Sequence, residues 1–142
     1  PGFRTGRGYL MKLHELLTYN FPSHMPGRFR LPGTAEHGFQ LRLNRLLKIL
    51  SAVPVDPVRE SARCYAEMVS LRPFCGANGR AARMLMDTRL LSCGLPPAII
   101  TFESRDVFFE LVERASGGDV EGLARFISER AASTPGLFPK ED

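Results

Sequence analysis

Residues 72–83 read Arg-Pro-Phe-Cys-Gly-Ala-Asn-Gly-Arg-Ala-Ala-Arg, and this stretch decides how the chain is organised. Pro73 cannot lie comfortably in a helix interior, and the glycines after it favour a loop. A helix is expected to begin near Asn78. It should end at Gly94, a natural helix C-cap that two prolines follow. The stretch therefore predicts a helix-loop-helix unit.

The loop in this unit has the features of an anion site. Backbone N–H groups at a helix N-terminus lack partners, and the helix dipole there favours negative charge. Glycines let a ligand approach the backbone closely. Arg80 and Arg83 lie three residues apart on one helix face and could hold phosphates. The spacing alone also fits a simple turn with two surface arginines.

The rest of the chain has apolar residues at helical spacing. This pattern predicts further helices at about 8–19, 41–50, 57–71, 104–115 and 119–131. Asp56 followed by Pro57 is a good helix start, because Asp accepts an N-terminal N–H and proline suits the first turn. No alternating strand pattern appears, so the expected fold is all-α, a compact bundle of about six helices. Residues 27–39 are expected to form a short hairpin or loop.

Composition indicates one ordinary globular domain. Of the 142 residues, 44% are hydrophobic and 24% are charged, and no apolar run approaches a membrane span of about 20 residues. Neither a membrane nor a nucleic-acid partner is expected, since no basic-aromatic binding motif appears. Three scattered cysteines argue against a disulfide framework or zinc site and favour a reducing compartment, here the cytoplasm of a bacterium or of a host cell. The chain lacks an initiator Met and is expected to be a fragment of a longer protein.

The twelve residues resemble the signature of the Fic family, His-Pro-Phe-x-Asp/Glu-Gly-Asn-Gly-Arg-x-x-Arg. Three flanking elements are similar to Fic domains as well: Leu13-His14-Glu15-Leu16-Leu17 with Pro26-Gly27-Arg28-Phe29-Arg30, Leu90-Leu91-x-x-Gly94-x-Pro96-Pro97, and Gly118-Asp119-x-Glu121. The resemblance implies one Fic-like domain over residues 1–132, with its core at about 10–130, and a mobile tail over 133–142. Two positions depart from the signature: Arg72 replaces the family's histidine, and Gly76 replaces its acidic residue.

The resemblance implies transfer of AMP from ATP to a Ser, Thr or Tyr hydroxyl of a target protein, with the histidine as general base and the acid holding Mg²⁺. Carried over, the nucleotide-binding residues are Phe74, Gly76, Ala77, Asn78, Gly79, Arg80 and Arg83. Arg72 takes the position of the base, but arginine stays protonated to a pKa above about 12 and cannot act as one near neutral pH. Without a carboxylate at Gly76, Mg²⁺ is doubtful and no metal ligand is predicted. Ala77 replaces a glycine, and its side chain is expected to fit only if the backbone stays at a negative φ.

Other residues near the signature carry further hypotheses. The resemblance implies that Leu31, Gly33, Thr34 and His37 belong to a flap on which a target protein is expected to dock. His37 is also a candidate base, and Cys75 is either a reactive thiol or a variable small residue. His14 and His24 are expected to be structural. Arg72 either adds a cation to the phosphate pocket or pairs with a local acid such as Glu67.

The sequence leaves three functions open. The first is a nucleotide-binding domain that has lost most or all of its AMP transfer. The second is an active nucleotidyl or phosphate-group transferase with a divergent mechanism. The third is a non-catalytic protein-interaction domain. The family's inhibitory Ser/Thr-x-x-x-Glu-Gly/Asn motif has no match, since Ser116 and Glu121-Gly122 lie one residue too far apart.

Overall fold

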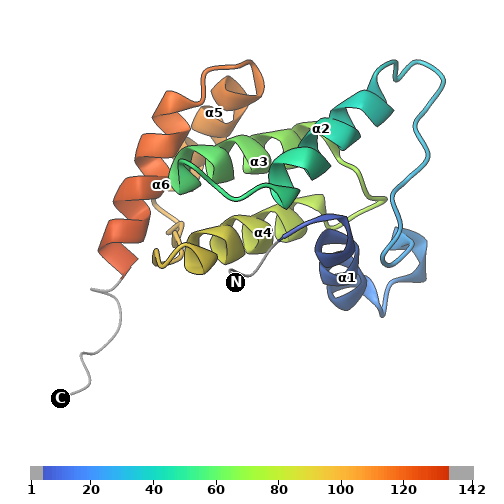
Figure 1. Cartoon of the computed structure of the whole chain (residues 1–142), viewed down its shortest axis with the longest axis horizontal. Coiled ribbons are helices and arrows are strands. Elements are labelled where there is room, and N and C mark those ends of the chain that lie inside the picture. Colours follow the sequence, from blue (N-terminus) through green and yellow to red (C-terminus); the bar gives the residue numbers. More distant parts are fainter. Residues whose placement is uncertain (1–4, 135–142) are drawn as a thin grey trace.

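The structure is a computed structural model that describes residues 5–134, and this range is helical and contains no strand (Figure 1). The helices are α1 (Arg7–Thr18), the 3₁₀ helix η1 (Pro22–His24), α2 (Phe39–Ser51), α3 (Pro57–Leu71), α4 (Asn78–Ser92), α5 (Arg105–Ser116) and α6 (Glu121–Ser133). The expected all-α bundle of six helices is confirmed. Residues 28–38 form a loop with two turns rather than a hairpin.

Local capping signals explain where the central helices begin and end. The Asp56 carboxylate accepts a hydrogen bond from the backbone N–H of Arg59 at 3.1 Å, which starts α3 as predicted. After α4, Gly94 adopts a left-handed φ of 77°. There the N–H of Leu95 donates to the carbonyl of Leu90 at 3.0 Å, closing a glycine cap that ends the helix.

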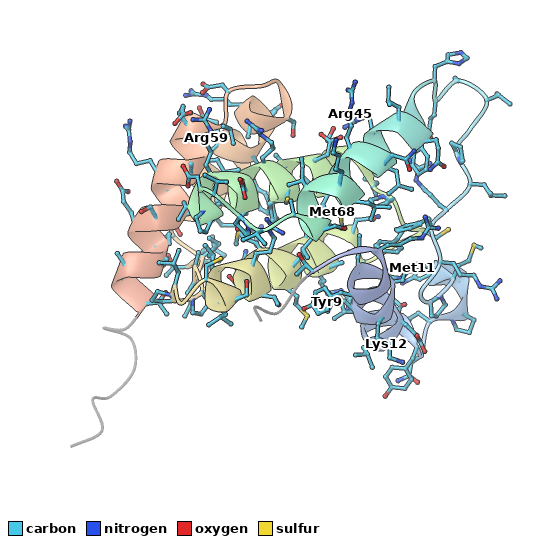
Figure 2. The ribbon with its side chains drawn as sticks, in the orientation of Figure 1. Tyr9, Met11, Lys12, Arg45, Arg59 and Met68 are labelled. Carbon is cyan, nitrogen blue, oxygen red and sulfur yellow. The ribbon has the colours of Figure 1, made fainter. Side chains whose placement is uncertain are left out.

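Helix α3 is the centre of the bundle and contacts α2, α4, α5 and α6. It runs side by side with α4 in the opposite direction, and the loop that joins them lies at one end of the molecule (Figure 1). Met68 of α3 is fully buried in the interior (Figure 2). At the other end, Phe108 of α5 packs on Tyr65 and Phe126 with ring centroids 5.1 and 5.7 Å apart. The core therefore holds α3 and α4 rigidly on either side of their connecting loop.

A buried arginine joins the start of the described chain to the bundle. Arg89 of α4 is 2% exposed and donates to the hydroxyl of Thr5 at 2.9 Å and to the carbonyl of Leu50 at 3.3 Å. Its charge faces Glu60 of α3 at 3.7 Å. A buried charge is tolerated only when it is paired and hydrogen-bonded, so this group ties α2, α3 and α4 together.

Helix α6 ends slightly later in the sequence than expected. Ser133 belongs to α6, and the hydroxyl of the buried Thr134 donates to the carbonyl of Pro97 at 2.6 Å. The remainder of the tail predicted to be mobile, residues 135–142, lies outside the described residues. Among the residues described, no helix is both long and apolar enough to cross a membrane.

Candidate functional site

The candidate site lies where α3 ends and α4 begins. Arg72 follows α3 with a left-handed φ of 51°, and its N–H donates to the carbonyl of Met68 at 3.0 Å. This turn directs the chain across the ends of both helices and into α4. A cavity of about 430 Å³ opens here, lined by Val69, Arg72, Ala77, Asn78, Gly79 and Arg80. The structure thus brings Arg72 together with most of the residues predicted to bind phosphate.

Asn78 shapes the loop through its side chain. Its amide oxygen accepts from the N–H of Phe74, and its amide nitrogen donates to the carbonyl of the same residue, both at 3.0 Å. The side chain is buried, so these two bonds close the loop over residues 74–78 in one conformation. Asn78 can therefore reach a ligand only through its backbone N–H.

Ala77 departs from its predicted conformation. We expected alanine to fit here only at a negative φ, and this was wrong: its φ is 58°. The chain must turn sharply at the N-cap of α4, and a left-handed residue makes that turn. For a residue with a Cβ, this conformation costs roughly 1–2 kcal/mol. The loop keeps the backbone that a glycine would adopt freely, although the residue is alanine.

The N-terminus of α4 presents free donors to the cavity. The first hydrogen bond of the helix runs from the N–H of Ala81 to the carbonyl of Ala77 at 2.9 Å. The N–H groups of residues 78, 79 and 80 precede that bond and have no helical partner. The exposed Arg80 adds a positive charge at the same end of the helix. Together these groups can hold a phosphate.

His14 of α1 supports the loop from behind. Its Nδ1 accepts from the N–H of Gly27 at 3.1 Å, so its Nε2 carries the proton and donates to the carbonyl of Gly76 at 3.0 Å. The ring also stacks on Phe74 with centroids 3.8 Å apart. Burial lowers the pKa of His14, and the nearby charges of His24 and Arg80 lower it further. His14 and Phe74 therefore position the loop, in agreement with the structural role expected of this histidine.

His24 lies directly against Gly76. A Cβ built on Gly76 would come within 2.7 Å of the His24 ring, closer than real Cβ contacts. The Nδ1 atom of His24 is buried and has no hydrogen-bond partner among the described residues. An acidic side chain at position 76 would therefore require the imidazole to move. The ring occupies the space next to Gly76 that the Cβ of any larger residue would need.

The magnesium ion that the family signature implies does not fit the residues present. No carboxylate lines the cavity beside Arg72. Within residues 5–134, no group of three or more His, Cys, Asp or Glu side chains could hold a metal ion. Mg²⁺ binds through carboxylates and phosphates in an octahedron of oxygen atoms. The cavity offers guanidinium and N–H groups instead, which are donors and cannot coordinate a cation.

Arg83 belongs to a second cavity on the other side of Arg80. This cavity, of about 580 Å³, is lined by Leu17, Tyr65, Gly79, Arg80, Arg83, Met84, Asp87 and Phe109. The Arg83 guanidinium lies 5.5 Å from the ring centroid of Phe108, and its buried Nε has no hydrogen-bond partner among the described residues. Burial raises the pKa of Asp87, whereas the N–H of Ala98 and the charge of Arg83 act against that rise. Arg80 is the arginine that borders both cavities.

Arg30 joins the flap to the end of α3, and the sequence analysis missed this role. Its guanidinium donates to the carbonyls of Arg72 and Leu71 at 2.5 and 3.0 Å and pairs with Glu36 at 2.7 Å. Its own N–H donates to the carbonyl of Pro73 at 2.8 Å. The Pro-Gly-x-Phe-Arg element could have indicated this role of Arg30, because an arginine side chain can donate hydrogen bonds to the carbonyls at a helix C-terminus.

The flap residues predicted to dock a target are exposed. Leu31, Gly33, Thr34 and His37 all lie on the surface. His37 borders a small cavity of about 160 Å³ together with Arg30 and Glu36, and Arg72 does not line that cavity. The structure therefore does not bring His37 into the cavity where a replacement base would be needed.

The structure replaces the one pairing that the sequence suggested. Glu67 pairs with Arg42 at 2.8 Å, so the suggestion that it is the acid paired with Arg72 was wrong. Glu121 pairs with Arg59 at 2.6 Å. Cys75 is exposed, and its sulfur atom lies 3.5 Å from the sulfur atom of Met25.

Comparison with protein families identifies the fold of this unit. The model of the Fic/DOC family matches residues 6–90, which include α1, the flap, the signature loop and most of α4. The chain belongs to the Fic/DOC family. The curated relatives include the protein adenylyltransferase Fic of Drosophila yakuba, 32% identical over 97 residues, or 68% of this chain and 20% of the relative. The Culex quinquefasciatus protein of the same name is 35% identical over 84 residues, or 59% of this chain and 17% of the relative. This Fic chain thus spans about a fifth of the length of these relatives.

Solved structures agree with this assignment. Fic-1 (aa134–508) from C. elegans superposes with a TM-score of 0.79 at 21% identity, covering 94% of this chain and 43% of that one. A Fic domain containing signaling protein from Bacteroides thetaiotaomicron superposes with a TM-score of 0.67 at 14% identity, covering 91% and 59%. The BepC protein of Bartonella tribocorum, solved with bound AMPPNP, reaches 0.62 at 18% identity, covering 92% and 76%. At these identities the likeness establishes the Fic fold, which includes α5 and α6 beyond the residues that the family model matches.

Proposed function

We propose that this Fic domain binds a nucleotide such as ATP or ADP through its phosphates and transfers AMP slowly or not at all. The observation that carries the proposal is the position of Arg72. Its side chain lines the same cavity as the N-terminus of α4, where the family signature has a histidine. A guanidinium there can bind phosphate and cannot accept a proton.

Nucleotide binding is supported by the donors that converge on this cavity. Two arginines, Arg72 and Arg80, and the free N–H groups at residues 78–80 line one opening. Such a cluster suits a phosphate chain, because each N–H or guanidinium bond to an anion is stronger than a neutral hydrogen bond. The BepC structure, which shares the fold, holds the ATP analogue AMPPNP.

Loss of transfer is supported by the lack of a substitute base in the cavity. General-base catalysis contributes about 10²–10⁴-fold to a rate. His14 uses both ring nitrogens in bonds to Gly27 and Gly76, and His37 lines a different cavity. His24 lies behind Gly76 rather than in the lining of the cavity. None of the three histidines is placed to take a proton from a hydroxyl bound there.

A target protein would dock on the flap, whose exposed Leu31 offers an apolar anchor.

The two surface thiols, Cys75 and Cys93, are free and suit a reducing compartment such as the cytoplasm.

Label transfer from ATP that carries a labelled α-phosphate tests the proposal. Wild type, Arg72→His and Arg72→Gln would be incubated with a cell lysate, and ATP binding would be measured in parallel by calorimetry. We expect wild type to bind ATP without transferring label. Transfer by wild type at the rate of Arg72→His would show an enzyme with another base. Failure of wild type to bind ATP or ADP at millimolar concentration would contradict the nucleotide site itself. Arg72→Gln removes the positive charge without adding a base. Comparing it with Arg72→His therefore separates the effect of losing the charge from the effect of gaining a base.

A further inference from the structure

We infer that the cavity beside Arg72 binds its nucleotide in the metal-free form and gains no affinity from Mg²⁺. The inference rests on the proposed function, because it specifies which ionic form of the nucleotide the site takes. It starts from the chemistry of the lining, in which every charged side chain is a cation.

The lining has no carboxylate with which to hold a divalent cation. Its charged groups are the guanidiniums of Arg72 and Arg80, and its remaining polar groups include the N–H donors at the start of α4. A magnesium ion needs oxygen ligands in an octahedron and usually takes one or two of them from carboxylates. Here a phosphate-bound Mg²⁺ would face two positive charges.

Three carboxylates on the surrounding segments have partners of their own. Glu67 pairs with Arg42 at 2.8 Å, and Glu36 pairs with Arg30 at 2.7 Å. Asp87 lines the second cavity and accepts from the N–H of Ala98 at 3.1 Å. Each would have to give up its hydrogen bond before it could turn toward the cavity beside Arg72.

The position that could supply a carboxylate is closed. Gly76 lies against the ring of His24, which leaves 2.7 Å between that ring and a Cβ at position 76. His24 itself does not substitute as a ligand in the cavity, because it is absent from the lining. Position 76 therefore carries no acidic ligand, and it has no room for a Cβ unless the His24 ring moves.

The guanidiniums of Arg72 and Arg80 can supply the positive charge that a bound magnesium ion would otherwise supply. Neither Arg72 nor Arg80 forms an ion pair with another residue in the range 5–134. The backbone of Arg72 is fixed by the bonds from Arg30 to the last carbonyls of α3. Metal-free ATP carries about four negative charges and its magnesium complex about two, so the free nucleotide is attracted about twice as strongly to the same cations.

Calorimetric titration of the whole chain with ATP tests this inference. One titration contains EDTA and the other contains saturating MgCl₂, at equal ionic strength, since phosphate contacts are sensitive to salt. We expect the Kd in EDTA to be no higher than the Kd in magnesium, and several-fold lower if Coulomb attraction dominates. A Kd that falls when magnesium is added overturns the inference and leaves the proposed nucleotide site standing. Binding in neither buffer overturns both.

Arginine variants test whether the cations of the cavity are responsible. Arg72→Gln should raise the Kd for metal-free ATP by about tenfold or more, the effect of losing a hydrogen bond to a charged group. Arg45→Gln is the matched control, because Arg45 is exposed on α2 and lies outside the cavity lining (Figure 2). It should leave the Kd within about twofold. Equal weakening by the two substitutions would show a general charge effect and overturn the role given to Arg72.

Discussion

At the scale of single residues, the backbone of Ala77 makes a direct prediction. Its φ of 58° is strained for alanine and free for glycine. Ala77→Gly should raise the free energy of unfolding by about 0.5–1 kcal/mol, after allowing for the greater chain entropy of glycine. Urea unfolding followed by far-UV circular dichroism measures the change. The control is Ala81→Gly, the same replacement inside α4, which should cost about 1 kcal/mol or more. Equal losses from both substitutions would contradict the strain.

The contact between Gly76 and His24 predicts a specific coupling. Gly76→Ala places a methyl group 2.7 Å from the imidazole and should destabilise the domain by about 1–3 kcal/mol, the usual range for overpacking. The loss should shrink when His24→Ala is introduced, because the clashing ring is then absent. A double-mutant cycle on urea midpoints measures the coupling. Additive effects of the two substitutions would show that the ring does not limit position 76.

At the scale of elements, His14 connects α1 to the signature loop and makes stability depend on pH. Its pKa is lowered from 6.5 in the folded protein, mainly by burial, so below that pH the unfolded chain binds the additional proton. This contribution to stability is present above pH 6.5 and is lost as the pH falls through the lowered pKa. The urea midpoint should be lower below pH 6.5 than above it, and His14→Gln should make this difference smaller. His37→Gln, at an exposed histidine, should leave it unchanged.

Arg30 holds the flap against α3, and its removal should loosen both segments. Arg30→Ala loses two bonds to helix carbonyls and the pair with Glu36, and should cost about 1–2 kcal/mol, because the group is partly exposed. Hydrogen exchange should become faster over residues 30–38 and 72–78. Arg28→Ala is the control, since this neighbouring arginine is exposed. Unchanged exchange in Arg30→Ala would exclude this role for the guanidinium.

At the scale of the whole molecule, the packing predicts that α5 and α6 unfold together with the signature helices. Phe108 is fully buried between Tyr65 of α3 and Phe126 of α6. Phe108→Ala should cost about 3–5 kcal/mol and lower a single unfolding transition. Phe102→Ala, at a phenylalanine that is 83% exposed, should change stability by less than about 0.5 kcal/mol. Calorimetry that showed two transitions would mean that α5 and α6 unfold separately from α3 and α4.

Local signals were enough to predict the helices. Asp56 and Pro57 begin α3, and Gly94 ends α4, through contacts within a few residues of the chain. Such contacts involve residues that are close together in the sequence, and all six helices lie within about two residues of their predicted bounds. The signature likewise indicated that Arg72 stands at the position of the family's catalytic base and that residues 76–80 form an anion-binding loop. Both assignments depend only on the spacing of residues along one loop and one helix turn.

Sequence alone therefore determined the helices, the family resemblance and the positions at which the chain departs from the family signature. Only the tertiary structure decided how the loop is held and which groups line the cavity beside it. The bond between His14 and Gly76 joins residues 62 apart, and the ring of His24 closes position 76 from another segment. Arg30 reaches the end of α3 from the flap, and Ala77 takes a left-handed φ because the two helix ends require it. These contacts depend on how the helices pack, and packing arises from many weak interactions between distant parts of the chain rather than from local spacing.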